Sequence, residues 1–234
     1  GFGADFLYHS GNNPDRMIFL GRLPMIAILI LLGFFVFRWT KELFGNNTAL
    51  LALFLYSFSP TLLAHGRLVT TDVGAAFGAF AATYYFVKYL KNNSAKNLIL
   101  SGIFFGIAEL LKFSLILLPP LFGLLVIAWS IIKADNFREF LKKFWFYFLG
   151  CVLIGLVALV LLWLVYLFHV WNYPPELQVR DTKFILNSFG IEPVKQLTIW
   201  MADKPIFRPF AQYMLGLLMV FQRLLLPRIG ETLH

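Results

Sequence analysis

Cysteine and charged residues are both scarce in this sequence. Its one cysteine, Cys151, lies inside an apolar run, which excludes an intramolecular disulfide and is typical of a small buried apolar side chain. Only 14% of the 234 residues are charged, whereas 59% are hydrophobic and phenylalanine occurs 27 times. Soluble domains do not have this composition. The chain is therefore predicted to be a polytopic membrane protein.

Several motifs that carry chemistry in other proteins are also missing. The sequence has no glycine-rich phosphate loop, no Walker pattern and no nucleophile elbow, so nothing in it indicates ATP-driven transport. The histidines His9, His65 and His169 have no regular ligand spacing, and we expect no metal site. The net charge of +8 comes from short loops rather than from one basic face, so we expect no nucleic-acid partner.

The apolar runs predict an all-α protein with about six transmembrane helices, because a bilayer core requires about 20 apolar residues per helix. The second, third and fourth runs are short for a full crossing, and flanking residues or the protein interior would have to accommodate them. Pro119 and Pro120 predict a kink or break in the fifth run. The six runs are Met17–Phe37, Ala49–Leu63, Val73–Phe86, Leu98–Leu111, Phe113–Ile132 and Phe144–Val170.

The distribution of basic residues predicts the orientation in the membrane. Nine lysines and arginines fall in three alternate connections, against two, Arg67 and Lys112, in the connections between them. Basic residues in short loops stay on the cytoplasmic side, so Arg67, Lys112 and the chain after Val170 are predicted to face the exterior. The nine are Arg38, Lys41, Lys88, Lys91, Lys96, Lys133, Arg138, Lys142 and Lys143.

The chain after Val170 is more polar. Residues Trp171–Pro209 predict an exterior loop with one short helix. Phe210–Leu226 is apolar again but is interrupted by Gln212, Gln222 and Arg223. It is either a seventh span or an interfacial amphipathic helix, and its polar residues favour the interfacial helix.

The polar cluster in Ser59–Asp72 is the strongest candidate site. Asp72 lies where the third apolar run begins, and it can act there as a helix cap. Capping does not account for His65 and Arg67 in the same connection. An imidazole, a guanidinium and a carboxylate at one membrane boundary suit an anionic, hydroxyl-rich ligand, because arginine pairs with phosphate and aspartate with sugar hydroxyls.

Two further cations have two interpretations each. Lys112 either pairs with Glu109, three residues earlier, or serves as a phosphate counter-ion in an exterior cavity. Arg22 either extends its head group to the membrane interface or points inward at an anion.

Three segments together resemble a known family of membrane enzymes. They are RLPMIAILILLGFFVFRWTKELFG, NNTALLALFLYSFSPTLLAHGRLVTTD and LILSGIFFGIAELLKFSLILLPPL, within Asn13–Trp129, with a weaker likeness in RPFAQYMLGLLMVFQR. The chain resembles the polyprenyl-phosphate-sugar-dependent glycosyltransferases of glycosyltransferase family 39, which include protein O-mannosyltransferases and aminoarabinose transferases.

This resemblance implies a multi-span helical bundle of the GT-C type, with residues 1–170 as a partial membrane domain and 171–234 as a truncated exterior region. It implies transfer of a sugar, with inversion and without a nucleotide, from a polyprenyl-phosphate donor to a protein, lipid or glycan acceptor. The expected setting is the bacterial plasma membrane, with the active face outward. Arg22, His65, Arg67, Asp72 and Lys112 are expected to bind the donor phosphate and sugar.

The family's acidic motif, which supplies the proposed catalytic base, is missing from this sequence. We expect the base upstream of Gly1 and assign neither Asp5 nor Asp15 to this role. Two other functions stay open. A transporter or lipid-linked-sugar flippase would also have polar residues at the opening of its cavity. Many transporters contain internal repeats, however, and this sequence shows none. In a non-catalytic membrane scaffold, the cluster would only cap and anchor helices.

Overall fold

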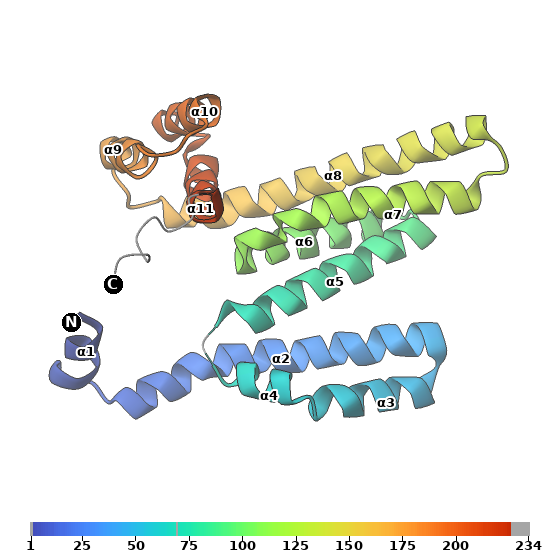
Figure 1. Cartoon of the computed structure of the whole chain (residues 1–234), viewed down its shortest axis with the longest axis horizontal. Coiled ribbons are helices and arrows are strands. Elements are labelled where there is room, and N and C mark those ends of the chain that lie inside the picture. Colours follow the sequence, from blue (N-terminus) through green and yellow to red (C-terminus); the bar gives the residue numbers. More distant parts are fainter. Residues whose placement is uncertain (1, 69, 226–234) are drawn as a thin grey trace, which may run out of the picture.

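The computed structural model describes residues 2–68 and 70–225, and every regular element within them is a helix. Five long helices, α2, α5, α6, α7 and α8, run side by side (Figure 1). They are α2 (Pro14–Phe44), α5 (Thr71–Lys91), α6 (Ala95–Leu111), α7 (Leu118–Lys133) and α8 (Phe137–His169). The shorter helices are α1 (Phe2–Ala4), the π-helix η1 (Asp5–His9), α3 (Asn46–Ser57), α4 (Pro60–Gly66), the 3-10 helix η2 (Phe113–Leu117), α9 (Pro175–Ile185), α10 (Glu192–Asp203) and α11 (Arg208–Leu225). The predicted all-α membrane fold is confirmed.

Three helical segments among the described residues are long and apolar enough to cross a membrane: α2, η2 with α7 (Phe113–Lys133), and α8. The bent pair α3 and α4 would make a fourth, so the predicted six spans are not confirmed. α5 is a central helix with ten buried residues, and α6 has only 17 residues. Because α5 and α6 pack against other helices, they do not need the uniformly apolar surface of a lipid-facing span.

The second predicted span is not one continuous helix. α3 ends at Ser57 and α4 begins at Pro60, with a bend of 58° between them. Pro60 is at the first position of α4, where a missing N–H is tolerated. The proline therefore starts a new helix in a different direction, and this turns the His65 end of α4 back toward α2.

The predicted break near Pro119 and Pro120 is present, but these prolines do not kink a helix interior. The chain forms the 3-10 helix η2 and changes to an α-helix at Leu118, so both prolines lie in the first turn of α7. In that turn the backbone N–H groups have no intrahelical acceptor, so proline removes no hydrogen bond. The break lies at the start of α7, where η2 meets it.

Local sequence signals explain the other helix boundaries. Asn13 caps α2 by accepting a hydrogen bond from the Arg16 N–H at 3.1 Å. α2 ends at Gly45, whose φ of +86° favours glycine and lets the chain reverse into α3. Ser94 and Asn136 cap α6 and α8 in the same way as Asn13, through side-chain oxygens that accept backbone N–H groups.

Successive helices alternate between two ends of the bundle (Figure 1). At one end, Lys88 of α5 bonds Glu42 of α2, and Tyr89 contacts Tyr147 near the start of α8. The nine basic residues all lie within the helix ends at this side, namely the ends of α2, α5 and α7 and the starts of α6 and α8, rather than in the connections themselves. The opposite end holds the starts of α2 and α5, the ends of α6 and α8, and helices α9–α11. The two-sided arrangement predicted from charge is therefore present in the fold.

Small residues let the central helices approach closely. A Cβ added at Gly102 of α6 would lie 2.5 Å from the Cβ of Val157 in α8, and one at Gly106 would lie 3.2 Å from the Cα of Ala158. This four-residue spacing of glycines is a common way for helices to pack closely in membranes. Between α5 and α7, Phe86 stacks on Phe122 with ring centroids 4.1 Å apart. The interior of the bundle is thus a close-packed α5–α6–α7–α8 core.

The region after Val170 contains more helix than predicted. It forms α9 and α10 instead of one short helix, and both precede α11. Buried Gln178 of α9 links to Arg208 of α11: the Arg208 Nε donates to Gln178 Oε1 at 2.8 Å, and Gln178 Nε2 donates to the Arg208 carbonyl at 3.1 Å. α11 packs against α8 and α10 and is not among the membrane-spanning segments of the described chain. This packing accords with a non-spanning helix.

Candidate functional site

The short helix α4 places His65 and Arg67 beside α2. Its last residue, Gly66, is buried against Leu29, and a Cβ at Gly66 would lie 2.5 Å from the Leu29 Cδ2. Only a glycine allows this close approach without moving Leu29. His65 and Arg67 flank this contact and are themselves exposed. The packing of Gly66 therefore fixes the backbone that carries both side chains.

Asp72 and Lys112 form an ion pair that joins two helix ends. The Lys112 Nζ donates to the Asp72 Oδ1 at 2.8 Å. Asp72 lies in the first turn of α5, and Lys112 immediately follows α6. Each charge is favourable at its own helix end, because helix N-termini attract anions and C-termini attract cations. The pair is 37% exposed at Lys112 and 54% at Asp72, so a ligand can reach both groups.

His65 belongs to the same cluster. The Asp72 pKa lies below its usual value, mainly because Lys112 donates a hydrogen bond to the carboxylate and places a positive charge beside it, with a smaller contribution from His65. The structure therefore brings Asp72 and Lys112 into direct contact at one end of the bundle, with His65 near enough for its charge to influence Asp72 and with Arg67 two residues after His65 in the chain.

Arg22 lies apart from these groups. It is exposed on α2, seven residues before Leu29, which corresponds to about 10 Å along a helix axis. Within the described part of the chain, no hydrogen bond or ion pair joins Arg22 or Arg67 to His65, Asp72 or Lys112. Arg22 shares the same end of the bundle, but it does not contact the Asp72–Lys112 pair.

One of the two interpretations of Lys112, a pair with Glu109, is wrong. α6 ends at Leu111, and Lys112 has an extended backbone with φ −160° and ψ 125°, so the helical i,i+3 geometry does not reach it. Lys112 turns to Asp72 instead. Glu109 is only 2% exposed, and its Oε2 accepts a hydrogen bond of 2.8 Å from the Tyr213 hydroxyl of α11.

The sequence-based site omitted Glu109 and Tyr213. A carboxylate inside the apolar run ILSGIFFGIAELL was the available signal, since ionisable groups at membrane depth rarely lack a role. The partner of Glu109, Tyr213, lies 104 residues later in the chain, and no local sequence pattern indicates this pairing. The second carboxylate oxygen of Glu109 is buried without a partner among the described residues.

A cavity adjoins the cluster. It has a volume of about 460 Å³ and lies between α6, α8, α9 and α11. Phe113, which directly follows Lys112, forms part of its wall, and Tyr166, His169 and Gln212 supply polar groups. An aromatic wall with a few polar groups is typical of small-molecule sites. Within the described residues, no group of three or more His, Cys, Asp or Glu side chains could hold a metal ion.

Comparison with known proteins identifies the family. A sequence model described as dolichyl-phosphate-mannose-protein mannosyltransferase matches residues 15–165, which is more than half of the chain. Searches of curated proteins and of solved structures found no match. The matched residues include the whole Asp72–Lys112 cluster and all five long helices except the end of α8 and the first residue of α2. The family match favours the glycosyltransferase interpretation over the transporter, flippase and scaffold alternatives. The chain belongs to the dolichyl-phosphate-mannose-protein mannosyltransferase family and is a membrane glycosyltransferase of the GT-C type.

Proposed function

We propose that the chain takes a sugar from a polyprenyl-phosphate donor and that the donor binds at the Asp72–Lys112 end of the bundle. The observation that carries this proposal is the ion pair between Lys112 and Asp72, whose charged atoms lie 2.8 Å apart at two helix ends. Both side chains are partly exposed, and His65 is near enough to influence the Asp72 carboxylate. Lys112 and Arg67 have the charge to bind the phosphate, with Arg22 farther along α2. No cofactor is assigned, and the lipid-linked sugar is the donor substrate.

The proposed reaction is a single displacement. The acceptor oxygen forms a bond to the anomeric carbon, the bond from that carbon to the phosphate oxygen breaks, and the lipid phosphate leaves with the electron pair. Attack from the face opposite the leaving group inverts the configuration. Cations beside the phosphate stabilise the charge that develops on it. Lys112 and Arg67 are suited to this role because both are cationic and their side chains are accessible to a ligand at this end of the bundle.

The acceptor hydroxyl must also lose a proton to a base. Lys112 lowers the pKa of Asp72, and a carboxylate with a lowered pKa is a weaker base at neutral pH. We therefore assign Asp72 to the sugar hydroxyls rather than to proton abstraction. As the acceptor, we propose a protein, because the family description names one, with lipid and glycan acceptors as alternatives.

The proposed setting is a bacterial plasma membrane, with the Asp72–Lys112 end facing outward. The nine basic residues of the opposite end support this orientation, because such residues are retained in the cytoplasm. Membrane lipid surrounds the bundle, and exposed apolar side chains such as Phe34, Leu124 and Phe168 are available to contact it.

Transfer of labelled sugar from polyprenyl-phosphate sugar in membranes tests the proposal. Arg67→Ala should lower transfer by about 10²-fold or more, the loss typical for removing a group that stabilises developing charge. Asp72→Asn should also lower transfer, because it removes the charged acceptor for the sugar hydroxyls and the ion-pair partner of Lys112. Arg138→Ala is the matched control, because this exposed arginine lies at the opposite end of the bundle. Unchanged transfer in Asp72→Asn and Arg67→Ala, at wild-type expression, would overturn the site assignment.

A further inference from the structure

A second cavity lies at the opposite end of the bundle from the proposed donor site. Its volume is about 430 Å³, within the range of small-molecule sites, about 300–1,000 Å³. It lies between the end of α2, the end of α5 and the start of α6. The lining residues are Trp39, Glu42, Leu43, Val87, Lys88, Lys91, Asn92 and Asn97.

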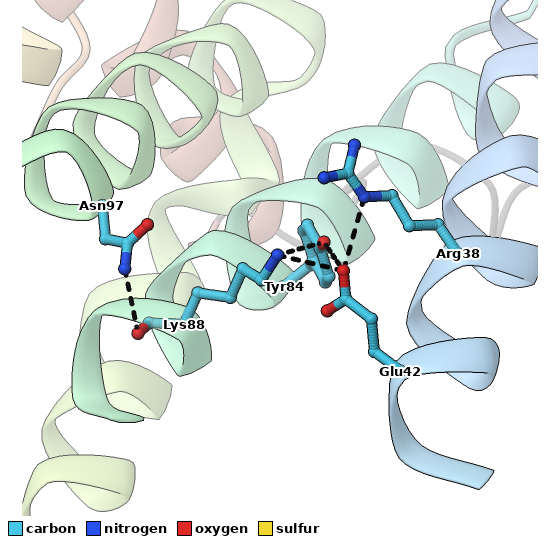
Figure 2. Close-up of polar contacts among 5 residues, drawn as sticks. All are labelled: Arg38, Glu42, Tyr84, Lys88 and Asn97. Atoms are coloured by element: carbon cyan, nitrogen blue, oxygen red, sulfur yellow. Dashed lines mark hydrogen bonds and ion pairs between the residues drawn. The ribbon is translucent and has the colours of Figure 1, made fainter. Parts of the chain in front are cut away.

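A hydrogen-bond network fixes the charged groups beside this cavity (Figure 2). The Glu42 Oε1 accepts from the Tyr84 hydroxyl at 2.7 Å, from Lys88 Nζ at 3.0 Å and from Arg38 Nε at 3.4 Å. Lys88 Nζ also donates to the Tyr84 hydroxyl at 2.8 Å. One carboxylate oxygen thus holds a lysine and an arginine in place between α2 and α5.

The cavity has an excess of positive charge. Among the lining residues, Lys88 and Lys91 carry two positive charges against the single negative charge of Glu42, which gives a net charge of +1, and Arg38 beside the cavity adds a further positive charge. Lys91 forms no ion pair with any described residue and is available for a ligand.

Amide groups and an apolar wall complete the lining. The Asn97 Nδ2 donates to the Asn92 carbonyl at 2.8 Å, which ties the start of α6 to the end of α5. Trp39, Leu43 and Val87 line the cavity with apolar surface. Tryptophan is enriched at the level of lipid head groups, and a free ion would gain nothing from such a wall. The lining as a whole suits a molecule with an anionic head and an apolar body.

We propose that this cavity binds the head group of an anionic phospholipid, with its phosphate at Lys91 and Lys88. Basic pockets between membrane helices on the cytoplasmic side bind such head groups, and this end of the bundle carries the nine basic residues. Because α2, α5 and α6 all contribute to the lining, the bound lipid would hold three helices together. The site is separate from the donor cluster and does not depend on sugar transfer.

Thermal unfolding of the purified protein in a non-ionic detergent tests this site. Three probes are titrated: short-chain phosphatidylglycerol, phosphatidylcholine of the same chain length, and inorganic phosphate. We expect phosphatidylglycerol to raise the unfolding midpoint in a saturable manner and the other two probes to leave it unchanged. Stabilisation by inorganic phosphate equal to that by phosphatidylglycerol would identify a free-anion site, and equal stabilisation by the two lipids would identify non-specific lipid binding. Either result overturns the proposal.

Two graded variants and a control locate the site. Lys91→Gln should lower the apparent affinity for phosphatidylglycerol about fivefold, which corresponds to the loss of one lysine contact, and Lys91→Glu should lower it further. Both changes lie at an exposed helix end, away from the Glu42 network, and leave the fold intact. Lys142→Gln removes an exposed lysine from the same end of the bundle, outside the cavity, and should change affinity less than twofold. Equal effects of Lys91→Gln and Lys142→Gln would overturn the assignment.

Discussion

The hydrogen bond between Tyr213 and Glu109 predicts a specific loss of stability when the tyrosine hydroxyl is removed. Tyr213→Phe deletes only that hydroxyl, at 2.8 Å from a carboxylate oxygen, and keeps the ring in its packing. The Glu109 side chain is 2% exposed, so water cannot replace the lost donor. A buried acceptor left without its partner costs about 1–3 kcal/mol, and we expect Tyr213→Phe to lower the free energy of unfolding by this amount.

The measurement is equilibrium unfolding of the intact protein in detergent. Tyr166→Phe is the matched control: its ring lies 5.7 Å from that of Tyr213, and its hydroxyl bonds no described residue. We expect a change within about 0.5 kcal/mol for this control. Glu109→Leu with Tyr213→Phe should cost less than the sum of the two single changes, because the double variant buries no unpaired polar group at this contact.

Two results would refute this reasoning. In the first, Tyr213→Phe is no more destabilising than Tyr166→Phe. In the second, the effects of Glu109→Leu and Tyr213→Phe simply add, which would show that the two side chains do not interact. Either result would mean that α11 is not held to α6 through this carboxylate.

Three other predictions concern helix packing, pH and the exterior region. Gly102→Ala should destabilise the protein by about 1–3 kcal/mol in the same unfolding assay. Gly155→Ala should be neutral or stabilising, because a Cβ added at Gly155 would lie in open space. Equal effects of the two changes would argue against close packing of α6 on α8. Because Lys112 lowers the pKa of Asp72, the Asp72 carboxylate stays charged as pH falls toward its usual pKa of about 3.9, and donor affinity should drop only below that value. In Lys112→Gln the drop in donor affinity should begin at higher pH. Coincident pH profiles of the two proteins would contradict this. Gln178→Ala leaves Arg208 without its side-chain acceptor and should speed proteolytic cleavage between residues 171 and 208; an unchanged cleavage rate would show that this link does not hold α9.

The sequence predicts most of the bundle and its two-sidedness because both depend on local composition. Apolar runs and basic connections are readable residue by residue, and the described helices alternate between the two ends as the charges indicate. The break at Pro60 was missed because apolar composition runs through it, while the direction of the chain changes by 58°. Proline position, rather than hydropathy, carries that information.

The site was only partly predictable, because its contacts join distant segments. Lys112 could be recognised as a charge near the membrane, but its partner Asp72 lies 40 residues earlier, and a pair with the nearer Glu109 was an equally reasonable prediction. Tyr213 lies still farther away, in a helix that packs onto the bundle only in the folded protein. Sequence spacing gives contacts within a helix but not those between helices.

The most direct test of the central claim, that the Asp72–Lys112 end binds a polyprenyl-phosphate donor, is thermal unfolding of the purified protein with polyprenyl phosphate. We predict that this lipid raises the unfolding midpoint of the wild-type protein and of Arg138→Ala, and that the rise is lost in Arg67→Ala. A rise of the same size in Arg67→Ala, or no rise in the wild-type protein, would contradict the account.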